Sequence, residues 1–107
     1  MVDSIHSFLC IARKAGRLFS GEDTCMRIVK NHKAVLVIIA NNSSENTKKR
    51  FSDICRYRKV NAIYFGTKDE LGKVAGKKET AIMAVTDQGF AKKLKQMMSD
   101  CSLKPGV

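Results

Sequence analysis

The chain has 107 residues, the length of one domain with a buried core. Its 44% hydrophobic and 28% charged content is that of a globular protein and excludes a disordered chain. Twenty Lys and Arg side chains against ten Asp and Glu give a net charge of +10, which favours a polyanionic partner. No helix places one cationic stripe opposite Trp and Phe, so a nucleic acid is favoured over a membrane surface.

A first amphipathic helix is predicted over residues 3–15. Ile5, Phe8, Leu9 and Ala12 recur at the spacing of one helix face, and Gly16 is expected to end the helix. Residues 17–20 are then expected to form a short strand.

A second helix is predicted from Gly21 to about residue 31. Ser20 is expected to cap it, with Asp23 completing a capping box, and both Glu22 and Asp23 would lie at the positive end of the helix dipole. Two interpretations remain open at this point. The segment is either a well-capped helix or a helix start that is offered to a nucleic acid.

The continuous apolar run over 34–40 is typical of a strand that is buried on both faces. Residues 41–44 are expected to be a loop that ends in a helix cap, and a third helix is predicted over 45–59.

The rest of the chain continues this alternation. A strand over 62–65 precedes a capping box at Thr67 and Glu70, which predicts a short helix through residue 75. A charged loop, a strand over 81–85 and a helix from Asp87 to about Cys101 follow.

Helices therefore alternate with short strands, without a linker or a repeat. This order predicts an α/β fold, a three-layer α/β/α sandwich with a small mixed four-stranded sheet. We expect residues 1–107 to form a single domain, with 103–107 as a frayed tail.

The sequence does not predict an enzyme, a cofactor or a metal site. The glycine spacing from Gly16 to Gly21 is that of a P-loop, but Glu22 stands where the phosphate-binding lysine must be. The acid pairs at Glu22 and at Asp69 both lie at predicted helix starts, where capping explains them. Neither histidine lies at ligand spacing from a cysteine, and the four cysteines are expected to be buried in helices of a soluble, cytoplasmic protein.

The basic and amide-rich segments suggest where a nucleic acid would bind. The run from Lys48 to Arg50 cannot face the core entirely and is either a solubilising face or a contact surface; the net charge favours the latter. The basic and amide-rich candidates in these loops are Asn42, Lys48, Lys77 and Lys78.

Five motifs occur in the order of a known family. They are ARKAG at 12–16, SGED at 20–23, VIIANNSS at 37–44, FGTKDELG at 65–72 and AVTD at 84–87. Together they resemble the kink-turn-binding ribosomal-protein family (archaeal L7Ae and its relatives), most closely its small bacterial YlxQ-like members, over about residues 4–95.

The resemblance implies a three-layer fold and non-catalytic binding of a kink-turn, a bent internal loop with tandem sheared G·A pairs. Gly21 matches the family glycine, whose helix enters the widened groove. Asp23 stands at the usual asparagine, Thr24 at a position often held by Glu or Gln, and Arg27 at a lysine. The loop over 77–80 corresponds to one that packs on an extruded nucleotide.

We therefore expect residues 1–107 to be a single RNA-binding domain of a monomeric protein that acts at the ribosome or in translation, with ribosomal proteins as further partners. The candidate RNA-binding residues are Gly21, Glu22, Asp23, Thr24, Arg27, Lys30, Asn42, Lys48, Lys77 and Lys78. Two other classes stay open: a protein-interaction subunit of a ribonucleoprotein particle, and a recognition module for an RNA-modifying enzyme. A membrane partner is not expected.

Overall fold

A computed structural model describes the backbone of residues 3–102 and the side chains of residues 4–99. The predicted frayed tail, 103–107, lies outside the described residues, as does the side chain of Cys101. Within the described range the elements are α1 (Asp3–Lys14), β1 (Leu18–Ser20), α2 (Glu22–Lys30), β2 (Leu36–Ile39), α3 (Glu45–Arg58), β3 (Asn61–Tyr64), α4 (Lys68–Ala75), β4 (Ile82–Val85) and α5 (Gln88–Ser102). Among these helices, none combines the length and apolar character needed to cross a bilayer.

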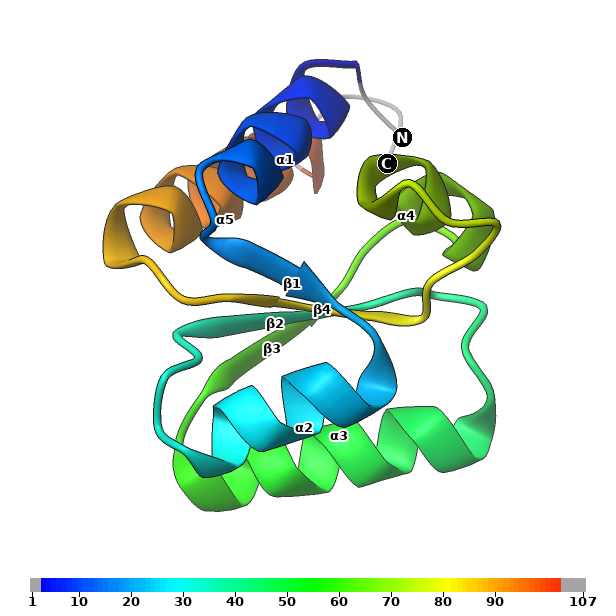
Figure 1. Cartoon of the computed structure of the whole chain (residues 1–107), viewed down its shortest axis with the longest axis vertical. Helices are drawn as coiled ribbons and strands as arrows, with labels where there is room; N and C mark the ends of the chain where they lie inside the picture. The colour runs from blue at the N-terminus through cyan, green and yellow to red at the C-terminus, as the bar shows by residue number, and fades with distance from the viewer. Residues whose placement is uncertain (1–2, 103–107) are drawn as a thin grey trace.

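The strands form one mixed sheet in the order β1-β4-β2-β3. β2 and β3 are parallel, whereas β4 is antiparallel to both of its neighbours, β1 and β2. Helices α2 and α3 cover one face of the sheet, and α1, α4 and α5 cover the other (Figure 1). This arrangement confirms the predicted three-layer α/β/α sandwich with a small mixed sheet.

The alternation of side chains along β2 divides the core into two parts. Leu36 and Ile38 belong to the cluster under α1, α4 and α5, whereas Val37 and Ile39 pack against α2 and α3. All four side chains have no exposed surface, which confirms that this strand is buried on both faces.

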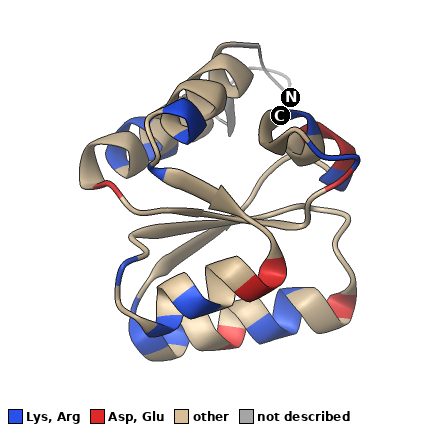
Figure 2. Ribbon diagram, viewed as in Figure 1, with Lys and Arg blue, Asp and Glu red and all other residues tan. Residues whose placement is uncertain are grey.

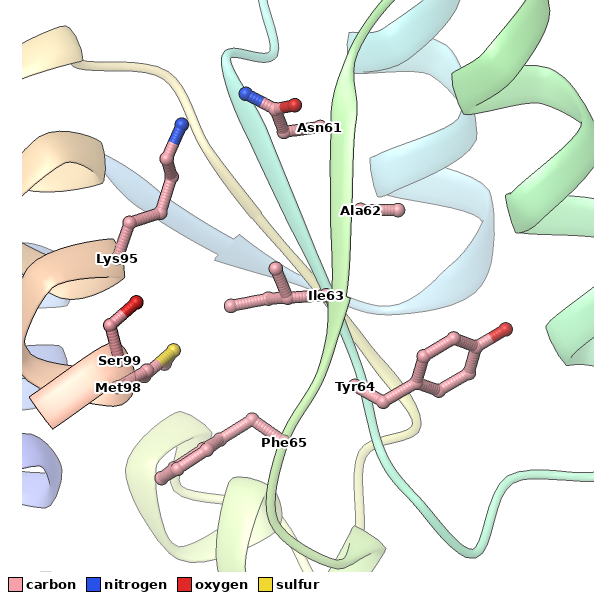
Figure 3. A pocket seen from close by; sticks show the side chains of 8 residues that line it. All are labelled: Asn61, Ala62, Ile63, Tyr64, Phe65, Lys95, Met98 and Ser99. Carbon is pink, nitrogen blue, oxygen red and sulfur yellow. The ribbon is translucent and has the colours of Figure 1, made fainter. Parts of the chain in front are cut away.

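The edge strand β3 alternates in the same way, although less of it is covered. Ile63 points toward α5, into an open groove that Met98 and Lys95 also line, while Ala62 and Tyr64 point to the other side (Figure 3).

Strand directions place four connections at one end of the molecule. Because β1, β2 and β3 run one way and β4 runs the other, the connections after β1, β2 and β3 lie beside the connection that enters β4. We call this the glycine end and define it as residues 20–22, 41–44, 65–68 and 76–80 (right-hand edge of Figure 1).

Two of the three predicted helix caps are confirmed. Ser44 Oγ accepts a hydrogen bond from the Thr47 N–H (3.2 Å), and Thr67 and Glu70 form the predicted capping box. The predicted cap at Ser20 is wrong. Ser20 is still paired in β1, opposite Met83, and Gly21 is the N-cap, without a side-chain cap hydrogen bond.

Gly72 allows the loop of residues 76–80 to lie directly on α4. A Cβ built on Gly72 would lie 2.7 Å from Glu79 Cα and 2.8 Å from the Lys78 carbonyl oxygen. Both are backbone atoms, so the whole loop would have to move to admit a methyl group. The Lys77 N–H also donates to the Gly72 carbonyl (2.8 Å), which ties the two segments together.

Gly72→Ala should therefore destabilise the protein. Alanine favours a helix by about 1 kcal/mol, but overpacking against backbone costs about 1–3 kcal/mol, so a net loss of about 1 kcal/mol is expected in urea unfolding. Lys73→Ala, at an exposed neighbouring position, is the control and should change stability by less than ~0.5 kcal/mol. Equal stabilities of the two variants would contradict the close packing.

Two buried thiols should make the free energy of unfolding fall as the pH rises above 9. Burial raises the pKa of Cys25 from 9.0 to about 12 and that of Cys55 to about 11. Below pH 9 the thiols are protonated in both the folded and the unfolded states. Above pH 9 they ionise only in the unfolded chain, so stability should fall by about 1.4 kcal/mol per pH unit for each thiol. Urea unfolding of the wild type and of Cys25→Ala at pH 8 and pH 10 tests this prediction. The free energy of unfolding should fall less between the two pH values in the variant than in the wild type. Identical falls would refute the contribution of Cys25.

Candidate nucleic-acid interface

A pocket of about 320 Å³ lies at the glycine end. It is formed where the start of α2, the start of α3, the start of α4 and the loop before β4 meet. Its lining residues are Gly21, Glu22, Ser44, Thr47, Lys68, Lys77, Glu79, Thr80 and Ala81.

Gly21 sets the geometry of the helix start. Its φ of 101° and ψ of 143° are rarely adopted by residues with a Cβ. Its N–H donates to the Ile82 carbonyl (3.1 Å), which fixes the start of α2 against β4. A Cβ at this position would meet only Lys77 Nζ, at 3.7 Å, so the conformation and not the space requires glycine. The first amides of α2 therefore lie beside an ammonium group, an arrangement suited to an anion.

Glu22 does not present a free carboxylate to this pocket. Arg50 Nη1 lies 3.5 Å from Glu22 Oε1, and the Thr47 hydroxyl donates to the carboxylate at 3.4 Å. Asp23, by contrast, is exposed and belongs to no ion pair within the part of the chain that the structure describes.

Hydrogen bonds between the loops hold the glycine end together. Asn42 Oδ1 accepts from the Lys68 N–H (2.8 Å), and the Lys68 carbonyl accepts from the Thr80 N–H (3.0 Å). Ser43 Oγ donates to the Ala81 carbonyl at 3.4 Å. These bonds join three loops that are distant in the sequence, so the pocket is preorganised.

Only some of the predicted site residues meet here. Gly21, Glu22 and Lys77 line the pocket, and Asn42 supports it from the neighbouring loop. Asp23 and Thr24 lie beside it in the first turn of α2, and Lys78 is exposed on the adjoining loop.

Three predicted residues point elsewhere. Lys30 ends α2, about 13 Å along the axis from Gly21 at 1.5 Å per residue, so it cannot share one contact with the helix start. Arg27 lines a different hollow with Thr24. Lys48 lies 3.7 Å from Glu45 and 6.0 Å from the centre of the Tyr64 ring.

The sequence analysis missed Lys68 and Arg50 as members of this site. Lys68 begins α4 and enters the pocket only because β3 lies next to β2, which no local pattern reveals. Arg50 was seen only as part of a basic run, whereas its structural role is to neutralise Glu22.

Among the described residues, no group of three or more His, Cys, Asp or Glu side chains could hold a metal ion. Burial raises the pKa of the Cys25 thiol in α2 to about 12, so this thiol is protonated and unreactive as a nucleophile at neutral pH.

Two relatives and one solved structure are similar to this chain over most of their length. A 40% identical relative, "RNA-binding protein YlxQ" from Bacillus subtilis, matches 80% of this chain and 86% of its own length. "Large ribosomal subunit protein eL30" from Branchiostoma belcheri is 28% identical over 92% of this chain and 89% of its own. A solved structure from Bacillus halodurans C, titled as a protein with unknown function, superposes with a TM-score of 0.83 at 30% identity, covering 89% of this chain and 96% of that one.

The model of the ribosomal protein L7Ae/L30e/S12e/Gadd45 family matches residues 3–95. This match confirms the resemblance drawn from the five motifs, and a ribosomal-protein family agrees with the expectation of a non-catalytic protein. The chain belongs to the ribosomal protein L7Ae/L30e/S12e/Gadd45 family.

Proposed function

We propose that this protein binds structured RNA without catalysis, in the cytoplasm, as a monomer associated with the ribosome or with translation. The observation that carries the proposal is the open start of α2 at Gly21 with Lys77 Nζ beside it. Relatives whose names include RNA binding and the large ribosomal subunit support the same function, with ribosomal proteins as neighbours.

The proposed ligand is a kink-turn or a similar bent internal loop. A distorted, non-duplex RNA exposes base edges that a narrow A-form groove hides, and a rigid protein edge can contact them. The loops tied together by Asn42, Lys68 and Thr80 supply such an edge. Lys77 and Lys78 would contact phosphates, and the first turn of α2 would face the bases.

The pairing of Glu22 makes this proposal compatible with the acidic first turn. With Arg50 and Thr47 on its carboxylate, Glu22 does not present an unneutralised charge, which leaves Asp23 and Glu79, both exposed, as the acids beside the pocket. An ionised Asp23 accepts hydrogen bonds from base amines but cannot donate.

A gel-shift titration tests the ligand class. The protein should bind a kink-turn RNA at least tenfold more tightly than the same RNA with its G·A pairs replaced by Watson–Crick pairs. Equal affinities would refute kink-turn recognition.

Lys77→Ala combined with Lys78→Ala serves as the non-specific comparison. It should weaken binding of both RNAs alike and lower the salt slope by roughly 1–2. Lys49→Ala combined with Lys93→Ala removes the same charge from exposed positions outside the pocket and should change either affinity less than twofold.

Asp23→Asn should raise the affinity for the kink-turn RNA more than for the altered RNA. The change restores a donor and removes a charge that repels phosphate. It should also lower stability by about 0.3–1 kcal/mol, because a carboxylate favours the start of a helix. Thermal melts and titrations of the same samples separate the two effects. A change in the melting temperature alone would show that Asp23 only stabilises α2.

A further inference from the structure

The end of the molecule opposite the glycine end carries much of the net charge. Here lie the last turns of α2 and α3, the start of α5 and the connections that enter β1, β2 and β3 (left-hand edge of Figures 1 and 2). We call this surface the basic end and define it as Arg17, Arg27, Lys30, Lys33, Arg58, Lys59, Lys92 and Lys95.

The carboxylates near this surface have structural partners of their own. Asp53 lies within salt-bridge distance of Lys49 and Arg56, and Asp87 caps α5 by accepting from the Phe90 N–H (3.0 Å). Within residues 3–102 none of the basic-end side chains belongs to an ion pair. Their charge is therefore available to an external anion.

Helix stability does not explain this charge in full. Cations in the last turns of α2 and α3 are favoured by the helix dipole. However, Lys92 and Lys95 lie in the second and third turns of α5, beyond the turn in which the dipole acts, so the dipole does not account for them. His32 and Lys59 adopt left-handed conformations, with φ of 60° and 61°, where Gly or Asn is the usual residue. Local stability therefore does not explain the presence of His32 and Lys59 at these two positions.

A hollow of about 430 Å³ gathers three of the ammonium groups. Lys59 enters it from the end of α3, and Lys92 and Lys95 from α5. The amides of Asn61 and Gln88 also line it, and its lining contains no acidic residue. Ammonium groups with amide donors are the groups that bind phosphate oxygens.

A second hollow, of about 750 Å³, lies between β1 and α2. Phe19, 38% exposed on the edge strand, lines it together with the cations Arg17, Arg27 and Lys33, again without an acid. An exposed aromatic ring beside cations is the combination that single-stranded nucleic acids use, because the ring stacks on a base while the cations meet the phosphates. Val35 lines both hollows, so the two are adjacent.

We propose that the basic end is a second RNA-binding surface, which takes an unpaired strand across the two hollows while the glycine end holds its own RNA element. The inference rests on the proposed function only in taking RNA as the partner. A concave surface with an accessible ring fits unpaired nucleotides better than a duplex, whose bases are stacked inside. An acidic protein segment would use the cations but would not require the phosphate spacing or the ring.

The test uses fluorescence anisotropy to measure the affinity for a labelled U-rich RNA of about 12 nucleotides, long enough for one small-domain site. This RNA should bind both to free protein and to protein already saturated with unlabelled kink-turn RNA. The basic-end variant combines Lys59→Gly, Lys92→Ser and Lys95→Ser. Glycine suits the left-handed position of Lys59, so the fold should be kept, and melting curves check this.

The matched control removes equal charge at exposed positions outside both hollows, by Lys49→Ser, Lys73→Ser and Lys93→Ser. The basic-end variant should lose roughly tenfold in affinity for the unpaired RNA and about 2 in salt slope, at about 0.7 per phosphate contact. The control should change less than twofold, and Lys77→Ala with Lys78→Ala should leave this binding unchanged.

Equal losses of affinity in the two triple variants would overturn the proposal, and so would displacement of the unpaired RNA by the kink-turn RNA. A basic-end variant that keeps its affinity for the unpaired RNA but no longer binds polyglutamate would also overturn it, because the surface would then belong to an acidic protein. Failure of the proposed function is distinct, because it would abolish kink-turn discrimination while binding of the unpaired RNA remained.

Discussion

The antiparallel placement of β4 between β1 and β2 brings the loop that carries Lys77 to the same end of the molecule as Gly21. If β4 ran parallel to its neighbours, the loop that carries Lys77 would enter the sheet at the far end from Gly21. Instead Gly21 donates to the carbonyl of Ile82, the first residue of β4, and the loop is held over α4 by the close approach to Gly72. Two short segments more than fifty positions apart thereby share one pocket.

The sequence predicted the order and the type of the elements because each rests on a local pattern. The buried run of β2 and the capping box at Thr67 could both be predicted without reference to the rest of the chain, and both are confirmed. The cap at Ser20 was predicted wrongly, because a Ser three residues before an acid has the same pattern whether or not its backbone is still paired in a strand.

The site itself was less accessible to local patterns. The predicted helix start and the family motifs pointed to Gly21, but the meeting of Lys68 and Lys77 depends on strand order. Lys30 was grouped with Gly21 because both belong to one helix, although the helix carries them to opposite ends. The number of cations can be read from the sequence, but the end of the sheet at which each cation lies depends on the strand directions.

The distribution of charge follows from the directions of the helices. α2 and α3 begin at the glycine end and carry acids there, and both end in cations at the opposite end, as the dipole favours. The preference that stabilises the helices thus places carboxylates where a phosphate backbone would approach. The pairing of Glu22 with Arg50 resolves this conflict. With side chains about half exposed, it adds little stability, so its main consequence is electrostatic: it removes one of the two negative charges from the helix start without giving up the helix that holds Gly21 in place.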